Sequence, residues 1–121
     1  MDLKETLEAY ATAWGETDAG IRSELLEACW ADDAVYADPK ARAEGRAALA
    51  DHIGGVQAEF PGLTIEITSG VDRHHDNIRF EWRLQLADGS TAEEGIDFAT
   101  LSDDGRLSGI TGFFGPIPPA S

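Results

Sequence analysis

Residues 77–86, NIRFEWRLQL, alternate strictly between apolar and polar side chains. This period of two is typical of a strand that has one buried face and one face exposed to water. The apolar positions that would share the buried face are Ile78, Phe80, Trp82, Leu84 and Leu86. A sheet with such a strand needs a second layer of structure to cover its apolar side.

The flanking segments have similar strand signals. Residues 63–71 (LTIEITSGV) also alternate, and residues 94–101 (EGIDFATL) and 106–114 (RLSGITGFF) have the composition of strands. The Asp-Gly pairs in ADGS and SDDGR are typical of tight hairpin turns. We therefore expect a meander of four antiparallel strands in the second half of the chain.

The first sixty residues have helical periodicity instead. Three helices are expected, the second with Thr17 or Asp18 as its N-cap and the third starting after Gly45. Gly54-Gly55 weakens the third helix by about 1 kcal/mol per glycine relative to alanine, so it predicts a kink or an early end. The apolar stripes are Leu3, Leu7, Tyr10 and Trp14, then Ile21, Leu25, Cys29 and Trp30, then Leu49, Ile53, Val56 and Phe60.

Between the second and third helices we expect only a short strand at residues 34–37 (AVYA), the helix ending near residues 31–33 and a loop covering residues 38–45. Helices followed by strands indicate an α+β fold with the helices packed on one face of a curved sheet. We expect one domain at residues 1–115 and a flexible, proline-rich tail at residues 116–121.

Charge narrows the possible partners. The chain has 23 acidic and 9 basic residues, and its net charge of −14 argues against nucleic acid and anionic membranes. No segment has the apolar length of a membrane span, the charged N-terminus does not resemble a signal peptide, and the single cysteine, Cys29, cannot form an internal disulfide. A cytoplasmic location is the expectation that follows.

The segment WADDAVYADP, residues 30–39, ends an apolar run with a carboxylate, Asp38, directly before Pro39. Burial penalises the charge of a carboxylate, so its position needs a reason. One possibility is that Asp38 caps backbone N–H groups of a turn. The other is that Asp38 lies in a pocket and transfers protons.

In their order and spacing, WADDAVYADP, GRAALADHI, GIDFATLSDDGRL and ITGFFG resemble the nuclear transport factor 2-like superfamily, in its SnoaL-like and ketosteroid-isomerase-like branch. The resemblance covers the chain from Leu3 to about Gly115. It implies a cone-shaped half-barrel, in which a curved, mostly antiparallel sheet wraps the N-terminal helices around an apolar pocket.

The resemblance also implies roles for individual residues. The aspartate of the D-P pair, Asp38, matches the catalytic base of ketosteroid isomerases, and the aspartate of the I-D pair, Asp97, matches their second catalytic aspartate. Tyr10 matches their hydroxyl donor, although an aromatic residue on a helical stripe is also an ordinary core residue. Alternation does not say which face of its strand Asp97 occupies. Further candidates for substrate contacts are Trp14, Trp82, Phe80 and Phe114.

These residues predict an enzyme that needs no cofactor and no metal, and that moves a proton next to a carbonyl group of a small hydrophobic ligand. Two alternatives stay open: a non-catalytic protein that binds an apolar ligand, and a cyclase, hydrolase or dehydratase that uses His74 or His75. A metal site at these two histidines is disfavoured because adjacent residues on a strand point to opposite faces. His52 is expected at the edge of the third helix. A homodimer is expected through the polar outer face of the sheet, which includes Arg79 and Arg83.

Overall fold

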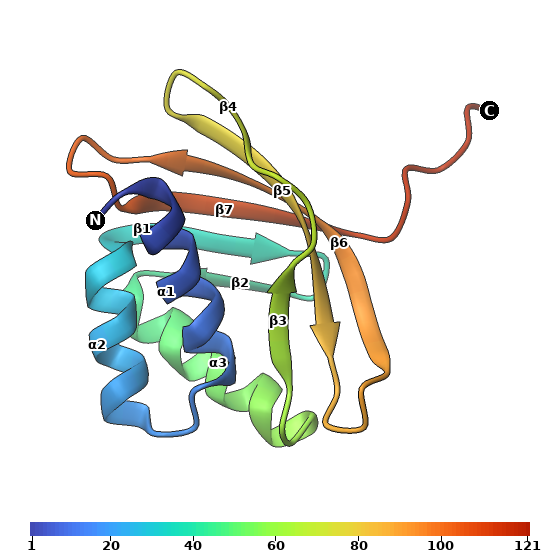
Figure 1. Cartoon of the computed structure of the whole chain (residues 1–121), viewed down its shortest axis with the longest axis horizontal. Coiled ribbons are helices and arrows are strands. Elements are labelled where there is room, and N and C mark those ends of the chain that lie inside the picture. Colours follow the sequence, from blue (N-terminus) through green and yellow to red (C-terminus); the bar gives the residue numbers. More distant parts are fainter.

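A strongly bent sheet covers three helices in the computed structural model, which describes residues 1–121 (Figure 1). The helices all lie on the concave side of the sheet. The elements are α1 (Leu3–Gly15), α2 (Ala19–Cys29), β1 (Trp30–Asp38), β2 (Ala41–Glu44), α3 (Arg46–Glu59), β3 (Thr64–Ile67), β4 (Asp72–His74), β5 (Asn77–Gln85), β6 (Thr91–Leu101) and β7 (Leu107–Phe114).

The strand order is β2-β1-β7-β6-β5-β3, with β4 paired to β5 outside this path. The chain from β3 to β7 confirms the expected antiparallel meander, and β4 forms a short hairpin with β5 within it. The one parallel pair joins β1 to β7, so the strand that follows the first two helices lies beside the last strand of the chain. The α+β fold with a curved, mostly antiparallel sheet is therefore confirmed.

Local sequence explains where the first two helices begin. Asp2 and Glu5 form a reciprocal capping box at the start of α1, in which each side chain accepts from the other residue's backbone N–H. Of the two expected candidates, Asp18 is the N-cap of α2. Its side chain accepts a hydrogen bond from the Ile21 backbone N–H at 3.0 Å. The predicted stripe of α1 is also confirmed, with Leu7, Tyr10 and Trp14 buried.

The segment between α2 and α3 differs from the prediction. The second helix ends at Cys29. Strand β1 starts at Trp30 and includes Asp32 and Asp33, where we expect the end of the helix from the sequence. Residues 41–44 form strand β2 and not a loop, because their backbone pairs with β1 in a hairpin from Asp38 and Ala41 to Val35 and Glu44. Edge-strand pairing is a tertiary effect that polar local sequence does not reveal.

Two helix predictions are also wrong: an early end of the third helix at Gly54-Gly55 and a place for Ile21 on a buried stripe. Helix α3 continues through Gly54-Gly55 to Glu59. Gly54 packs against the guanidinium group of Arg22, and a Cβ atom at this position would lie 3.5 Å from Arg22 Nη2. On α2, Ile21 is 47% exposed, whereas Arg22 is buried. The Arg22 guanidinium donates from Nη1 to Gln57 Oε1 at 2.6 Å and to the Glu16 carbonyl at 3.2 Å, so its partners are neutral acceptors, while its buried Nε has no partner.

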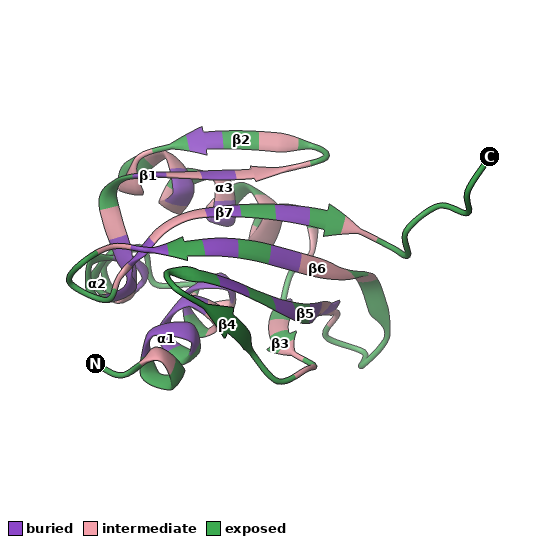
Figure 2. Ribbon diagram, turned by 90° about the horizontal axis from the view of Figure 1, so that it is seen from above, coloured by how far each residue is buried: buried purple, intermediate pink, exposed green.

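The buried residues of the core come from the helices and from alternating positions of the strands (Figure 2). Fully buried Leu26, Trp30, Leu49 and Ile53 form its centre. No helix is long and apolar enough to cross a membrane.

The outer face of the sheet carries the expected charges, with ion pairs between Arg79 and Asp72 and between Arg83 and Glu66. It also carries two exposed aromatic rings, Phe98 and Phe113, which pack edge to face with their centroids 5.9 Å apart.

Candidate active site

A cavity of about 410 Å³ opens between the helices and the concave face of the sheet. Its lining is mostly apolar and aromatic, as is usual for small-molecule pockets of this size. Phe80, which we expected to contact the substrate, does not line it; this ring is part of the buried core instead. The other candidate residues do line the cavity: Tyr10, Trp14, Asp38, Trp82, Asp97 and Phe114.

Asp38 both caps a turn and lines the cavity. Its Oδ1 atom accepts hydrogen bonds from the backbone N–H groups of Lys40 at 2.8 Å and Ala41 at 2.9 Å, so it caps the turn that Pro39 begins. Its Oδ2 atom accepts from the Tyr36 hydroxyl at 2.6 Å on the side of the cavity. Three donors thus fix the carboxylate, and Oδ2 keeps a lone pair for a ligand.

Asp97 lies on the concave face of β6, which settles the question of its orientation. It is 6% exposed and shares this face with Ala99 and Leu101, whereas Phe98 points outward. Burial raises its pKa to about 7. The nearby Trp82 indole N–H lowers the pKa of Asp97, although it forms no hydrogen bond of good geometry. The negative charge of Asp38 raises this pKa further. Near neutral pH, Asp97 therefore exists partly as a neutral acid that can donate a hydrogen bond.

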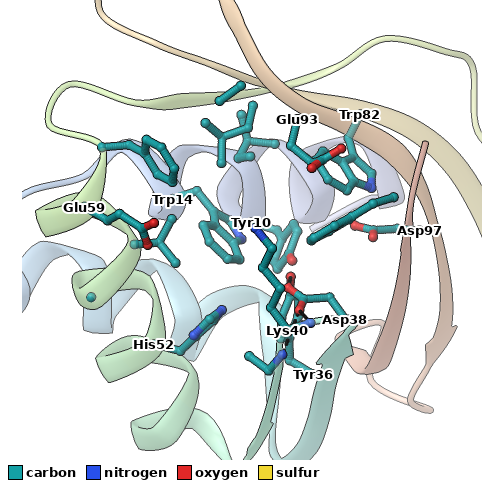
Figure 3. Close-up of a pocket in the computed structure, with 18 residues that line it drawn as sticks. Tyr10, Trp14, Tyr36, Asp38, Lys40, His52, Glu59, Trp82, Glu93 and Asp97 are labelled. Atoms are coloured by element: carbon teal, nitrogen blue, oxygen red, sulfur yellow. Dashed lines mark hydrogen bonds between the residues drawn. The ribbon is translucent and has the colours of Figure 1, made fainter.

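Two tyrosine hydroxyls reach the same region from different elements. Tyr10 comes from α1 and Tyr36 from β1, and Figure 3 shows both converging on Asp38 at the centre of the cavity. Burial raises the pKa of Tyr10 well above its ordinary value, and the charge of Asp97 adds to this effect. Burial and the neighbouring Tyr10 also raise the pKa of Tyr36. Both hydroxyls consequently keep their protons and remain donors.

Sequence reasoning missed several residues of the cavity, of which Tyr36 and His52 contact other aromatic rings of its lining. Tyr36 lies two positions before Asp38, and alternation along a strand predicts the same face for both. His52, which we expected at the edge of the third helix, lines the cavity. The centroid of its ring lies 5.8 Å from that of Trp14 and 5.5 Å from that of Tyr36. The spacing of His52 and Val56, one helical turn apart, could have indicated its direction.

The remaining polar residues divide between the cavity and the surface. Lys40, Glu59 and Glu93 also line the cavity, and the Lys40 ammonium lies 5.9 Å from the centre of the Phe114 ring (Figure 3). His74 and His75 lie outside it, in the exposed hairpin between β4 and β5. Charge at the cavity therefore comes mainly from carboxylates.

Comparison with known proteins agrees with this architecture. A family model of the SnoaL-like domain matches residues 7–110. A proposed isomerase of the SnoaL-like family from Agrobacterium tumefaciens strain C58 is 32% identical, with a TM-score of 0.85, and the match covers 92% of this chain and 95% of that one. None of the curated proteins matches.

Two more distant structures share the fold. A nuclear transport factor 2-like protein of unknown function from Exiguobacterium sp. 255-15 is 19% identical, with a TM-score of 0.73 over 93% of this chain and 99% of that one. A proposed polyketide cyclase from Sinorhizobium meliloti is 20% identical, with a TM-score of 0.69 over 88% of this chain and 92% of that one. With the family model covering most of the sequence, the chain belongs to the SnoaL-like family.

Proposed function

We propose that this protein is a cofactor-independent enzyme that moves a proton next to a carbonyl group of a hydrophobic ligand, in the manner of ketosteroid isomerases. The main support is the convergence of Tyr10, Asp38 and Asp97 on one apolar cavity, from α1, β1 and β6. Asp38 is a carboxylate that accepts from three donors, so it suits the role of a base. Asp97 is a buried acid with a pKa of about 7, so it suits the role of a hydrogen-bond donor.

In the proposed reaction, Asp38 Oδ2 removes a proton from the carbon next to the carbonyl group. The electron pair of the broken C–H bond moves onto the carbonyl oxygen and forms an enolate. The Tyr10 hydroxyl and the protonated Asp97 carboxyl donate hydrogen bonds to this oxygen, which stabilise its charge where water is excluded. For a β,γ-unsaturated ketone, Asp38 returns the proton to the γ carbon, and the double bond moves into conjugation with the carbonyl group.

The cavity also limits the substrate. A volume of about 410 Å³ with aromatic walls suits a ligand of a few rings and few charges. The tyrosines and the neutral form of Asp97 supply donors, which match a ketone oxygen. Neutral cyclic ketones are therefore the substrate class that we propose.

Asp38→Asn tests the role of the base. The amide can still accept from the Lys40 and Ala41 N–H groups, so the turn should persist, whereas the amide cannot take up a proton. Loss of a general base typically costs roughly 10²–10⁴-fold in rate. The rate is measured by isomerisation of a bicyclic β,γ-unsaturated ketone and by exchange of its α protons in heavy water, with circular dichroism to check the fold.

The matched control is Asp33→Asn, which removes the same charge from an exposed position on the same strand. Its activity should equal that of the unchanged protein. Equal activity of the Asp38→Asn variant, in a protein that turns over the ketone, would exclude Asp38 as the base.

A further inference from the structure

A glycine separates the two acids of the cavity. Strand β7 lies between β1 and β6, and Gly112 on β7 is directly opposite Asp97 on β6. On the other side, Thr111 is paired with Ala37, so Asp38 is level with Gly112. Two strand spacings of about 4.8 Å thus separate the acids across one residue without a side chain.

Backbone conformation does not require this glycine. The glycines with positive φ are all elsewhere, at residues 45, 62, 89, 105 and 115. Gly112 has a conformation that other residues can adopt, and glycine inside a strand lowers stability unless close approach of another group requires it.

The space at Gly112 is occupied by Asp97. A Cβ atom on Gly112 would lie 2.7 Å from Asp97 Oδ1, which is too short for a carbon–oxygen contact, and 3.6 Å from the Cβ atom of Asp38. The obstructed atom is the end of a side chain and not backbone. A methyl group here would therefore displace the Asp97 carboxyl and leave the strand in place.

We propose that Gly112 is a positioning residue of this site, whose missing side chain lets the Asp97 carboxyl lie across β7 toward Asp38. The inference rests on the proposed function, in which Asp97 donates to the enolate oxygen. A methyl group pushes the carboxyl away from β7 into the cavity, where it gains solvent and loses its aim at the reacting oxygen. Gly112 acts only through Asp97 and does not touch the substrate.

The other groups around Asp97 stay unchanged in such a variant. Tyr10 faces it from α1 and Trp82 from β5, while Asp38 and Tyr36 face it from β1. The remaining charged or titratable residues of the cavity are Lys40, His52, Glu59 and Glu93. A changed titration of Asp97 after substitution of Gly112 therefore reports the displacement of its own carboxyl.

Gly112→Ala is the test, with Gly109→Ala as the matched control on the same strand. A Cβ atom on Gly109 would meet Val35 O at 3.4 Å and Thr100 Oγ1 at 3.6 Å, which are ordinary contacts away from the acids. Carbon-detected NMR follows the titration of the Asp97 carboxyl. In Gly112→Ala we expect its midpoint to fall by about one pH unit or more and kcat to fall about tenfold with KM nearly unchanged. Gly109→Ala should change neither, and an unchanged Asp97 midpoint in Gly112→Ala would overturn the inference.

A double-mutant cycle with Asp97→Ala isolates the contact. Gly112→Ala should lower the unfolding midpoint in the normal background and have no effect in the Asp97→Ala background, where Oδ1 is absent. If Gly112→Ala alone does not fold, the double variant should fold. Equal effects in both backgrounds, or failure of both to fold, would overturn the inference. The titration and this cycle need no turnover, so absence of proton transfer would refute the proposed function separately.

Discussion

Replacing Asp97 by asparagine should make the protein more stable at neutral and alkaline pH. The folded state raises the pKa of Asp97 from an ordinary 3.8 to about 7, mainly because the carboxyl is buried. Between these two values the folded chain holds a proton that the unfolded chain releases, so the free energy of unfolding falls as pH rises. The contribution of the protonated Asp97 to the free energy of unfolding is fully present below pH 3.8 and is lost as pH rises through about 7.

The size of this effect follows from the two pKa values. A difference of about three pH units at about 1.4 kcal/mol each corresponds to about 4 kcal/mol of cost at pH 8. Asparagine has nearly the same shape and carries no charge, so Asp97→Asn removes this cost. We therefore expect the variant to be more stable than the unchanged protein by about 2–4 kcal/mol at pH 8, with little difference at pH 4.

Urea unfolding of both proteins at several pH values between 4 and 9 measures the difference directly. Carboxylates that do not interact with Asp97 contribute equally to both proteins, so the subtraction isolates Asp97 together with its coupling to Asp38. Asp103→Asn, an exposed substitution with the same charge change, controls for the net charge of −14. A difference between Asp97→Asn and the unchanged protein that does not depend on pH would refute the reasoning about burial.

Two further predictions concern Asp38's partner and the core. Tyr36→Phe removes the hydroxyl that donates to Asp38 Oδ2. We therefore expect a loss of about 1–3 kcal/mol of stability in urea unfolding and a smaller loss of kcat than in Asp38→Asn. Unchanged stability would show that this hydrogen bond contributes nothing. Leu49→Ala truncates a fully buried side chain of α3 and should cost about 2–5 kcal/mol in thermal or urea unfolding, whereas truncation of the exposed Ile21 should cost much less.

The elements that were predicted correctly are those whose pattern repeats along the chain. Alternation in residues 77–86 and the Asp-Gly turns predict β5 and its hairpins, and the apolar stripe up to Trp14 predicts α1. Strand β2 could not be predicted in this way, because it exists through its pairing with β1. The same limit explains Gly54-Gly55, where the contact with Arg22 lies outside the local sequence.

For the site, the sequence identifies candidate residues better than it identifies their surroundings. Family resemblance indicated Tyr10, Asp38 and Asp97, which all line the cavity. Alternation could not choose the buried face of Asp97, because Ile96 and Phe98 on the opposite face are apolar too. The packing of β6 decides its buried face, and the hydrogen bond from Tyr36 to Asp38 depends on side-chain conformations that alternation does not specify.

The parallel pairing of β1 with β7 has a consequence for how the molecule matures. Synthesis from the N-terminus makes the three helices and the other strands before β7, the strand that separates Asp38 from Asp97. Until Leu107–Phe114 pairs with β1 and β6, no strand joins the part of the sheet that carries Asp38 to the part that carries Asp97. The cavity wall that holds both carboxyl groups is therefore complete only when this last strand of the sheet docks.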